Sequence, residues 1–264
     1  MTLQRLEHEP LSDLLPRARQ CLANTLDWLL PRYCLMCGDP SGDMNLCLPC
    51  QADLPRTGPC CRRCGLKLKG EHDGVCAPCL LHPPLWERVL PALEYAFPVD
   101  VLVQKFKFNR SLACGEVLAQ AMLRAVDCAE APSSSTGLQG PADADCIVPV
   151  PLHRSRLAVR GFNQSEVVAR YVARRTGIPF NGRLLSRVRR TAAQSDLDGK
   201  ARRRNTRGAF HCNTERAHGI RHAILLDDVM TTGATLEACT LELKRVGIAT
   251  VTLWVVARAP PPGR

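Results

Sequence analysis

The sequence AILLDDVMTTGATL, at residues 223–236, is the most specific pattern in this chain. It begins as a short apolar strand, continues with Asp227 and Asp228, passes through a loop rich in Thr and Gly, and enters an amphipathic helix predicted over 235–246. In open α/β sheets, ligands bind beyond the carboxyl ends of the strands. The order of strand, acidic pair, loop and helix therefore predicts an α/β domain with a ligand site at this point.

The loop has the chemistry of a phosphate site. A helix N-terminus offers unpaired backbone N–H groups and a partial positive charge, both of which favour an anion. Thr231, Thr232 and Thr235 add hydroxyl donors, and Gly233 lets the backbone approach a phosphate closely. The loop matches neither of the common glycine-rich nucleotide motifs, which disfavours dinucleotide and ordinary ATP sites. The preceding acidic pair suits ribose hydroxyls or hydrated Mg2+, so a phosphorylated ribose fits best.

Strands and helices alternate through the C-terminal two thirds of the chain. Apolar patterning predicts strands over 89–97, 146–150, 223–226 and 251–257, and helices over 112–129, 163–176 and 235–246. This alternation is typical of a mainly parallel sheet with helices on both faces. The Ser, Pro and Gly of 131–145 predict an exposed loop within that domain.

Eight of the fifteen cysteines form four Cys-x-x-Cys pairs near the N-terminus. The pairs are Cys34/Cys37, Cys47/Cys50, Cys61/Cys64 and Cys76/Cys79. Two intervening residues let both sulfurs of a pair reach one metal ion, so the pattern predicts two structural Zn2+ ions, each held by four cysteines. The repeat of CLMCG and CRRCG favours sequential pairing, but a cross-brace stays open, as do Cys60, His72 or His82 as substitute ligands.

Three parts follow from these patterns: an amphipathic helix within 1–30, a double zinc ribbon over 31–82 and the α/β domain over 85–260. Zinc supplies the folding energy that the proline-rich second part lacks in apolar residues. Six other cysteines with apolar neighbours are predicted to lie in the core: Cys21, Cys114, Cys128, Cys146, Cys212 and Cys239.

The sequence shows neither a membrane-spanning segment nor a signal peptide, and both observations bear on the expected compartment. No stretch approaches the ~20 consecutive apolar residues that a membrane span requires, and the N-terminus does not resemble a signal peptide. Cysteines that serve as metal ligands fit a reducing compartment. We therefore expect a cytoplasmic protein without membrane insertion.

Further motifs make the ligand site more specific. IVPVPLH stands at 147–153, RGFNQ at 160–164 and GAF at 208–210, and Gln194 precedes an Arg-rich stretch ending at Asn205. The 223–236 stretch resembles the 5-phosphoribosyl-1-pyrophosphate (PRPP) motif of type I phosphoribosyltransferases. The whole set, behind a double zinc ribbon, is similar to the ComF family from about residue 29 to residue 258. The resemblance implies a type I phosphoribosyltransferase-like α/β fold preceded by a small Cys-rich module.

The resemblance also implies roles for residues at the site. Asp227 and Asp228 would hold the ribose diol of PRPP. The 5′-phosphate would lie against Met230, Thr231, Thr232, Gly233, Ala234 and Thr235, and the pyrophosphate would meet Leu152, His153 and Arg154. Arg154, Arg160 and Mg2+ would stabilise charge on a departing pyrophosphate. No residue is identified as a catalytic base, so the catalytic residues stay unknown.

A basic segment accounts for most of the net charge of +10. Between Arg183 and Arg207 the chain has nine Lys or Arg residues and two Asp, and we predict a mobile basic loop. The resemblance implies that part of it closes over PRPP. The remaining cations, Arg202, Arg203 and Arg204 among them, suit a nucleic-acid backbone.

A second basic stretch, KFKFNR at 105–110, interleaves Lys105 and Lys107 with Phe106 and Phe108. Alternating cations and aromatic rings suit phosphate contacts and base stacking on single-stranded DNA. The competing interpretation is that both rings face the core and that the charges are merely solvated.

Two functions stay open. In the first, the protein binds PRPP with Mg2+, with phosphoribosyl transfer to an unknown acceptor, and acts in uptake or utilisation of external DNA. In the second, the same fold is a non-catalytic scaffold for single-stranded DNA. In either case the zinc ribbons offer docking surfaces for proteins of the DNA-uptake machinery. The role in competence comes from the family resemblance alone.

Overall fold

The computed structural model describes residues 32–68, 74–130, 143–189, 206 and 208–260. The chain divides into two compact units, with the boundary between Asp53 and Leu54. The first unit contains one four-cysteine cluster and the short helix α2 (Leu48–Ala52), which begins at a proline-containing turn after Cys47. The second unit contains the other cluster, the helix α3 (Ala77–Leu81) and the whole α/β sheet.

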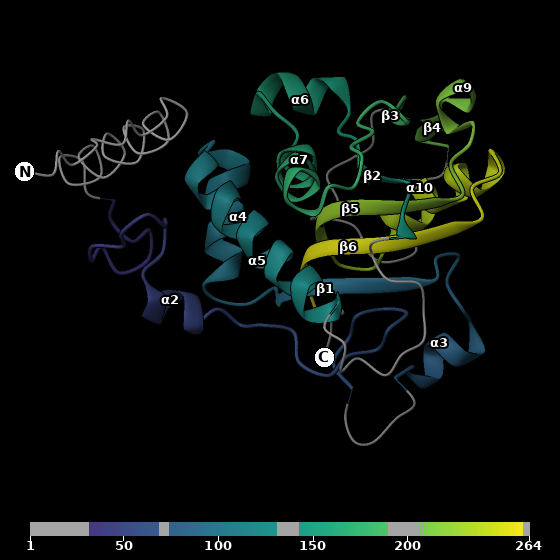
Figure 1. Ribbon diagram of the computed structural model, residues 1–264. Helices are drawn as coiled ribbons and strands as arrows, with labels where there is room; N and C mark the ends of the chain where they lie inside the picture. The colour runs from purple at the N-terminus through teal and green to yellow at the C-terminus, as the bar shows by residue number, and fades with distance from the viewer. Residues whose placement is uncertain (1–31, 69–73, 131–142, 190–205, 207, 261–264) are drawn as a thin grey trace, which may run out of the picture. The chain divides into compact units, whose positions relative to one another are not determined.

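The sheet has four parallel strands in the order β1-β6-β5-β2. Their bounds are β1 (Arg88–Glu94), β2 (Cys146–Pro149), β5 (His222–Met230) and β6 (Thr250–Arg258). Figure 1 shows β5, β6 and β1 lying side by side in that order. β5 and β6 are central, and their apolar residues are almost all buried, as expected for strands covered on both faces.

Helices cover both faces. One face packs against α5 (Leu112–Glu130) and α7 (Gln164–Thr176), with α4 (Val99–Phe108) against α5; the other packs against α10 (Ala234–Arg245). Along β5 the side chains alternate, so that Ala223 and Leu225 join the core beneath α10. Over the part of the chain that the structure describes, none of the helices is both long enough and apolar enough to span a bilayer.

The predicted architecture is confirmed: a parallel sheet with helices on both faces, together with an N-terminal Cys-rich module. β5 extends four residues beyond the predicted 223–226, because β6 continues to pair with it as far as Met230. Three features were not predicted, namely α4, the seven-residue α6 (Arg154–Arg160) and the antiparallel pair β3 (Leu185–Arg187) and β4 (Phe210–Cys212).

Two predictions are corrected. The start of the predicted basic loop at 183–207 is strand β3, in which Leu185 and Arg187 face inward, so Arg187 is 9% exposed rather than solvated. Cys128 is exposed, because it lies on the outer side of α5, whereas Cys114, Cys146, Cys212 and Cys239 are buried as predicted. The predicted N-terminal helix with Cys21, most of the 131–145 loop and 190–205 lie outside the described residues.

Candidate functional site

A cavity of about 620 Å³ opens at the carboxyl end of β5. Its walls come from α4, α6, the start of α7, β3 and the loop between β5 and α10. Ten of the residues predicted for the ligand site line it: Asp227, Asp228, Met230, Thr231, Thr232, Gly233, Ala234, Thr235, Leu152 and Arg160. The fold therefore brings the acidic pair, the Thr/Gly loop and the segment from Leu152 to Arg160 together around one cavity.

The acidic pair is held by side chains from two helices. Asp227 Oδ1 accepts hydrogen bonds from Ser165 Oγ and from the amide of Asp228, each at 2.9 Å. Asp228 Oδ2 forms an ion pair with Lys107 Nζ at 2.8 Å, with both side chains mostly buried. Burial, followed by the charge of Asp228, raises the pKa of Asp227 to about 7. A nearby cation or ligand hydroxyl would favour the charged form, and carboxylate oxygens are the ligands that Mg2+ prefers.

The loop before α10 is shaped around Gly233. This residue is the N-cap of the helix, with φ +81°, a region that favours glycine. A Cβ atom there would also lie 3.0 Å from Met230 Cε and 3.3 Å from Trp86 Cη2. The Oγ1 of Thr232 accepts from the amide of Ala234 at 3.4 Å. A twelve-residue helix begins here with its N-terminus at the cavity, the arrangement that suits a phosphate.

Several cavity residues were not identified from the sequence. Gln164, which is 1% exposed, accepts from Arg160 Nη1 at 3.1 Å, and its Nε2 has no protein partner among the described residues. Asn163 donates from Nδ2 to Val150 O at 2.9 Å, which anchors the start of α7 beneath the cavity. Arg187 lies 5.2 Å from the ring centre of Phe210, and burial lowers its pKa. The RGFNQ motif pointed to this region, but nothing local marked Arg187 or Ser165.

Two residues predicted to meet pyrophosphate are not part of the cavity lining in the described chain. His153 is the N-cap of α6, and its Nδ1 accepts from the amide of Ser155 at 3.2 Å. Arg154, the first residue of α6, is exposed. Arg156, two residues further along and therefore on the opposite side of the helix, lines the cavity with Arg160. Of the three arginines of α6, Arg156 and Arg160 therefore line the cavity, whereas Arg154 does not.

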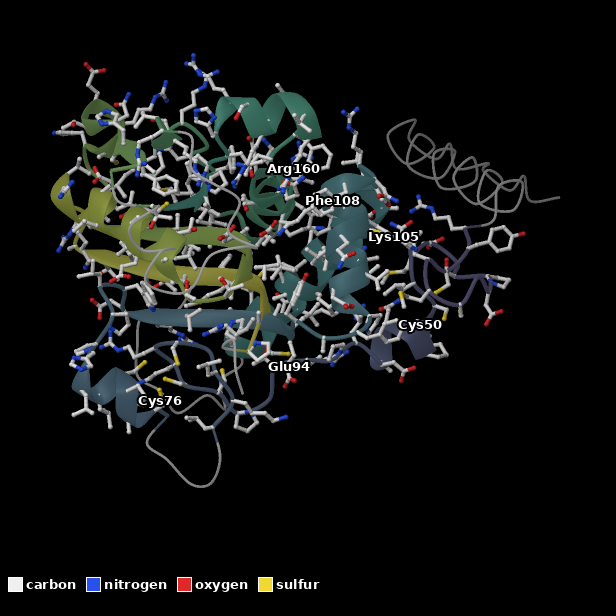
Figure 2. The ribbon with its side chains drawn as sticks, turned by 180° about the vertical axis from the view of Figure 1, so that it is seen from behind. Cys50, Cys76, Glu94, Lys105, Phe108 and Arg160 are labelled. Carbon is white, nitrogen blue, oxygen red and sulfur yellow. The ribbon has the colours of Figure 1, made fainter. Side chains whose placement is uncertain are left out.

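The KFKFNR stretch is divided between the core, the cavity and the surface. Phe106 is fully buried, whereas Phe108 is 69% exposed at the cavity rim. The guanidinium of Arg160 lies 5.4 Å from the ring centre of Phe108, and Figure 2 shows the two side by side. Lys105 is exposed, while Lys107 faces Asp228 in the cavity. Arg202, Arg203 and Arg204 lie outside the described residues.

The cysteines form two clusters in sequential order, which confirms the favoured pairing. One consists of Cys34, Cys37, Cys47 and Cys50, and the other of Cys61, Cys64, Cys76 and Cys79. Within each cluster the four sulfurs lie within 4.8 Å of one another. Amides point at the sulfurs, as from Met36 to Cys34 at 3.5 Å and from Cys76 to Cys61 at 3.3 Å. The sulfur atoms around Cys76 are visible in Figure 2.

The thiols have the character of metal ligands. Burial opposes ionisation of Cys34 and Cys61, but the amide hydrogen bonds outweigh it and lower their pKa values to about 6 and about 7. Thiolates grouped in fours are the donor set of structural zinc sites. The residues present therefore fit one Zn2+ ion per cluster.

Comparison with known proteins agrees with this assignment. Residues 25–80 match the double zinc ribbon domain. The DNA utilization protein YhgH of Salmonella typhimurium is 34% identical over 232 residues, which cover 87% of this chain and 98% of that protein. The same protein of Escherichia coli K12 is 33% identical over 231 residues, with the same coverage. Competence protein F of Haemophilus influenzae is 32% identical over 218 residues, or 81% of this chain and 91% of that protein.

The fold and the site define an α/β protein with a cavity at the carboxyl end of its parallel sheet and an N-terminal double zinc ribbon. The chain belongs to the ComF family, the family of YhgH and Competence protein F. The two four-cysteine clusters and the zinc-ribbon match together support two structural zinc ions.

Proposed function

We propose that this protein binds PRPP with Mg2+ in the cavity at the end of β5 and acts in the uptake or utilisation of DNA. One observation carries the proposal. An acidic pair fixed by Ser165 and Lys107 faces the same cavity as a glycine-capped helix N-terminus. Few small molecules need a diol acceptor beside a phosphate site, and a ribose 5-phosphate is one that does.

The proposed placement assigns each part of PRPP to described residues. The 5′-phosphate lies against the loop from Thr231 to Thr235, and the ribose hydroxyls meet Asp227 and Asp228. The cations Arg156, Arg160 and Arg187, which line the cavity, face the pyrophosphate. Bound Mg2+ would supply charge neutralisation on the pyrophosphate oxygens. These residues bind and orient PRPP, and transfer to an acceptor requires a nucleophile from elsewhere.

The biological role is proposed from the relatives. Their names refer to DNA utilization and competence, and the similarity covers nearly their whole length. We propose that this chain has the same role and acts in the cytoplasm, where thiolates stay reduced and retain zinc. Proteins of the DNA-uptake machinery are the proposed partners of the zinc ribbons.

Calorimetric titration of PRPP into the zinc-loaded protein, with and without Mg2+, tests the proposed ligand. We expect micromolar binding that depends on Mg2+ and that weakens at least tenfold in Asp228→Asn, because the amide lacks the negative charge and one of the two acceptor oxygens of the carboxylate. Asp127→Asn makes the same chemical change on the exposed side of α5 and should bind like the wild type. Ribose 5-phosphate and pyrophosphate, titrated separately, distinguish the two ends of the cavity.

Two results would count against the proposal. Absence of PRPP binding in the zinc-loaded wild type would remove PRPP as the ligand. Equal weakening in Asp228→Asn and Asp127→Asn would show a loss of folding rather than of a contact. If PRPP binds, release of pyrophosphate in the presence of nucleobases or single-stranded DNA tests phosphoribosyl transfer.

A second function, binding of single-stranded DNA, is favoured by the exposed ring of Phe108. A large aromatic ring that is 69% exposed, with Arg160 above one face, offers its other face for base stacking. Lys105 and Arg110, both exposed, stand near it in sequence for phosphate contacts. PRPP binding and DNA binding are compatible, because Phe108 lies at the cavity rim rather than on its floor.

Salt dependence tests the DNA surface. The logarithm of the affinity for single-stranded DNA should fall linearly with the logarithm of salt concentration, by about 0.7 for each phosphate contact. Phe108→Ala should weaken binding by about 1 to 3 kcal/mol without changing this slope. Replacing Arg202, Arg203 and Arg204 by Ala should make the slope shallower. Phe97→Ala removes an equally exposed ring outside the cavity lining and serves as the control.

A further inference from the structure

One buried arginine joins the second cysteine cluster to the loop proposed to bind phosphate. Arg258, the last residue of β6, donates from Nε to the carbonyl of Cys64 at 2.7 Å. Its Nη1 donates to the carbonyls of Met230 at 3.0 Å and Thr231 at 2.6 Å. A single planar guanidinium thus holds the cluster and the start of the loop at the same time.

Arg258 is buried, so its hydrogen-bond partners matter for its placement. The residue is 7% exposed, and burial lowers its pKa. A buried cation is costly unless an anion or several hydrogen bonds compensate it. Here the backbone carbonyls of Cys64, Met230, Thr231 and Ala259 accept from the guanidinium, so one of its four hydrogen-bond partners belongs to the second cluster.

Trp86 makes a second connection between the same two parts. Its Nε1 donates to the carbonyl of Arg63 at 2.6 Å, and Arg63 Nη1 donates back to the carbonyl of Trp86 at 2.8 Å. Arg63 lies between the ligands Cys61 and Cys64. The indole ring is 5% exposed and packs close to Gly233, where a Cβ would lie 3.3 Å away.

These contacts act on the groups that would hold a phosphate. In a trans peptide, the carbonyl of one residue and the N–H of the next point in opposite directions. Fixing the Thr231 carbonyl on Arg258 therefore turns the Thr232 N–H away from Arg258. Thr231, Thr232 and Gly233 line the cavity, and within the described chain Arg258 is not part of that lining. The arginine supports the loop from behind.

We propose that Arg258 is a positioning residue that couples occupancy of the second zinc cluster to ligand binding in the cavity. The inference rests on the proposed function, because it takes the 230–235 loop as the phosphate site. Coupling between two sites is reciprocal. Zinc in the second cluster should tighten PRPP binding, and PRPP should tighten zinc binding by the same factor.

Zinc competition with a chelator at equilibrium, with and without saturating PRPP and Mg2+, measures this factor. The full-length Cys50→Ser protein keeps a complete second cluster, and the Cys79→Ser protein keeps a complete first cluster. We expect PRPP to tighten zinc binding about tenfold in Cys50→Ser, within the range of roughly 5- to 150-fold that is typical of coupled sites. In Cys79→Ser the effect on the remaining cluster should be below twofold.

The role of Arg258 is tested by Arg258→Lys in the Cys50→Ser protein. Lysine keeps the positive charge, but its single ammonium group cannot bridge the Cys64 carbonyl and the Met230 and Thr231 carbonyls as the planar guanidinium does. Tightening by PRPP should fall below twofold, while the protein still binds zinc. Arg245→Lys makes the same change on the exposed end of α10 and should keep the full effect. If Arg258→Lys fails to fold, Trp86→Phe breaks the other connection and should reduce the tightening severalfold.

The outcomes separate the two proposals. If PRPP does not bind the zinc-loaded wild type, the proposed function fails and this inference fails with it. If PRPP binds but leaves zinc affinity in Cys50→Ser unchanged, only the coupling is wrong. Full tightening retained in both Arg258→Lys and Trp86→Phe would overturn the assignment to these residues.

Discussion

The two cysteine clusters have nearly the same sequence pattern but different surroundings. Around the first, the backbone hydrogen bonds include local ones such as that from the amide of Leu35 to Asn45 O at 2.9 Å, and among the described residues no atom lies within 4 Å of a Cβ built on Gly38. At the equivalent position of the second, a Cβ on Gly65 would lie 3.3 Å from Val89 and Pro91 of β1. The second cluster is built into the sheet.

The ligand pattern therefore specifies the metal, whereas the flanking contacts specify which part of the protein the metal stabilises. Both sites offer four sulfurs from two Cys-x-x-Cys pairs. Among the described contacts, only those of the second cluster reach the loop that lines the cavity. They do so through Arg258 and Trp86. Four experiments test this contrast, and the largest effect is expected for loss of a ligand.

Cys61→Ser should destabilise the α/β unit by several kcal/mol, whereas Cys34→Ser should leave its stability within about 1 kcal/mol of the wild type. Structural zinc contributes roughly 10 to 16 kcal/mol of apparent binding free energy in small zinc peptides. Only the second cluster belongs to the α/β unit. Urea unfolding followed by far-UV circular dichroism measures the change. Equal losses in the two variants would break the contrast.

The paired variants Gly38→Ala and Gly65→Ala come next. Both glycines have positive φ, +82° and +70°, which costs an L-residue about 1–2 kcal/mol. Only Gly65→Ala adds overpacking against β1, which typically costs a further 1–3 kcal/mol or so. Zinc affinity of each cluster and the free energy of unfolding should both show the larger loss for Gly65→Ala. A larger loss for Gly38→Ala would contradict the packing argument.

Gln51→Ala should act on the first cluster alone. The buried Gln51 donates from Nε2 to Leu46 O at 2.7 Å, next to the ligands Cys47 and Cys50. Removing a buried hydrogen bond costs about 1–3 kcal/mol. We expect weaker zinc binding by the first cluster in chelator competition, with PRPP affinity unchanged. A parallel loss of PRPP affinity would show that the first cluster also acts on the cavity.

The smallest effect is the pH dependence that His222 adds to the stability of the α/β unit. Burial lowers the pKa of His222 below its usual value of 6.5, and residues 32–53 contain no histidine. The imidazole of His222 therefore binds a proton more readily in the unfolded chain than in the folded protein. Its contribution to stability is fully present above about pH 6.5 and is lost as the pH falls through the folded pKa. Urea midpoints between pH 7.5 and 5.5 should show a shallower slope for His222→Gln. Identical slopes would exclude His222 as the source.

Much of the fold could be predicted, because the strands and long helices are specified locally. Buried parallel strands are continuous apolar runs, so β2, β5 and β6 were identified close to their observed positions. α7 begins after Asn163 and ends at Gly177, whose φ of +75° matches a left-handed helix cap. Short elements such as α6 and β3, with few apolar residues, gave no comparable periodicity.

The candidate site could be predicted only where its residues are adjacent in the chain. The acidic pair and the Thr/Gly loop form one continuous stretch and all line the cavity. Ser165 and Lys107 reach that stretch only through packing of α7 and α4, and Ser165 is 62 residues from its partner Asp227. The role of Arg258 depends on a contact with Cys64 across 194 residues. No local pattern contains such information.

The zinc module also has a consequence for solubility, because it covers an edge of the sheet. β1 is an outer strand, and its amide at Val89 donates to Arg62 O at 2.8 Å while Leu93 forms a bridge with Arg56. An uncovered edge strand is a template for pairing with other chains. Pro91 protects only one position of that edge. A chain that loses zinc from the second cluster would therefore be prone to aggregate, so zinc shortage would deplete the protein itself.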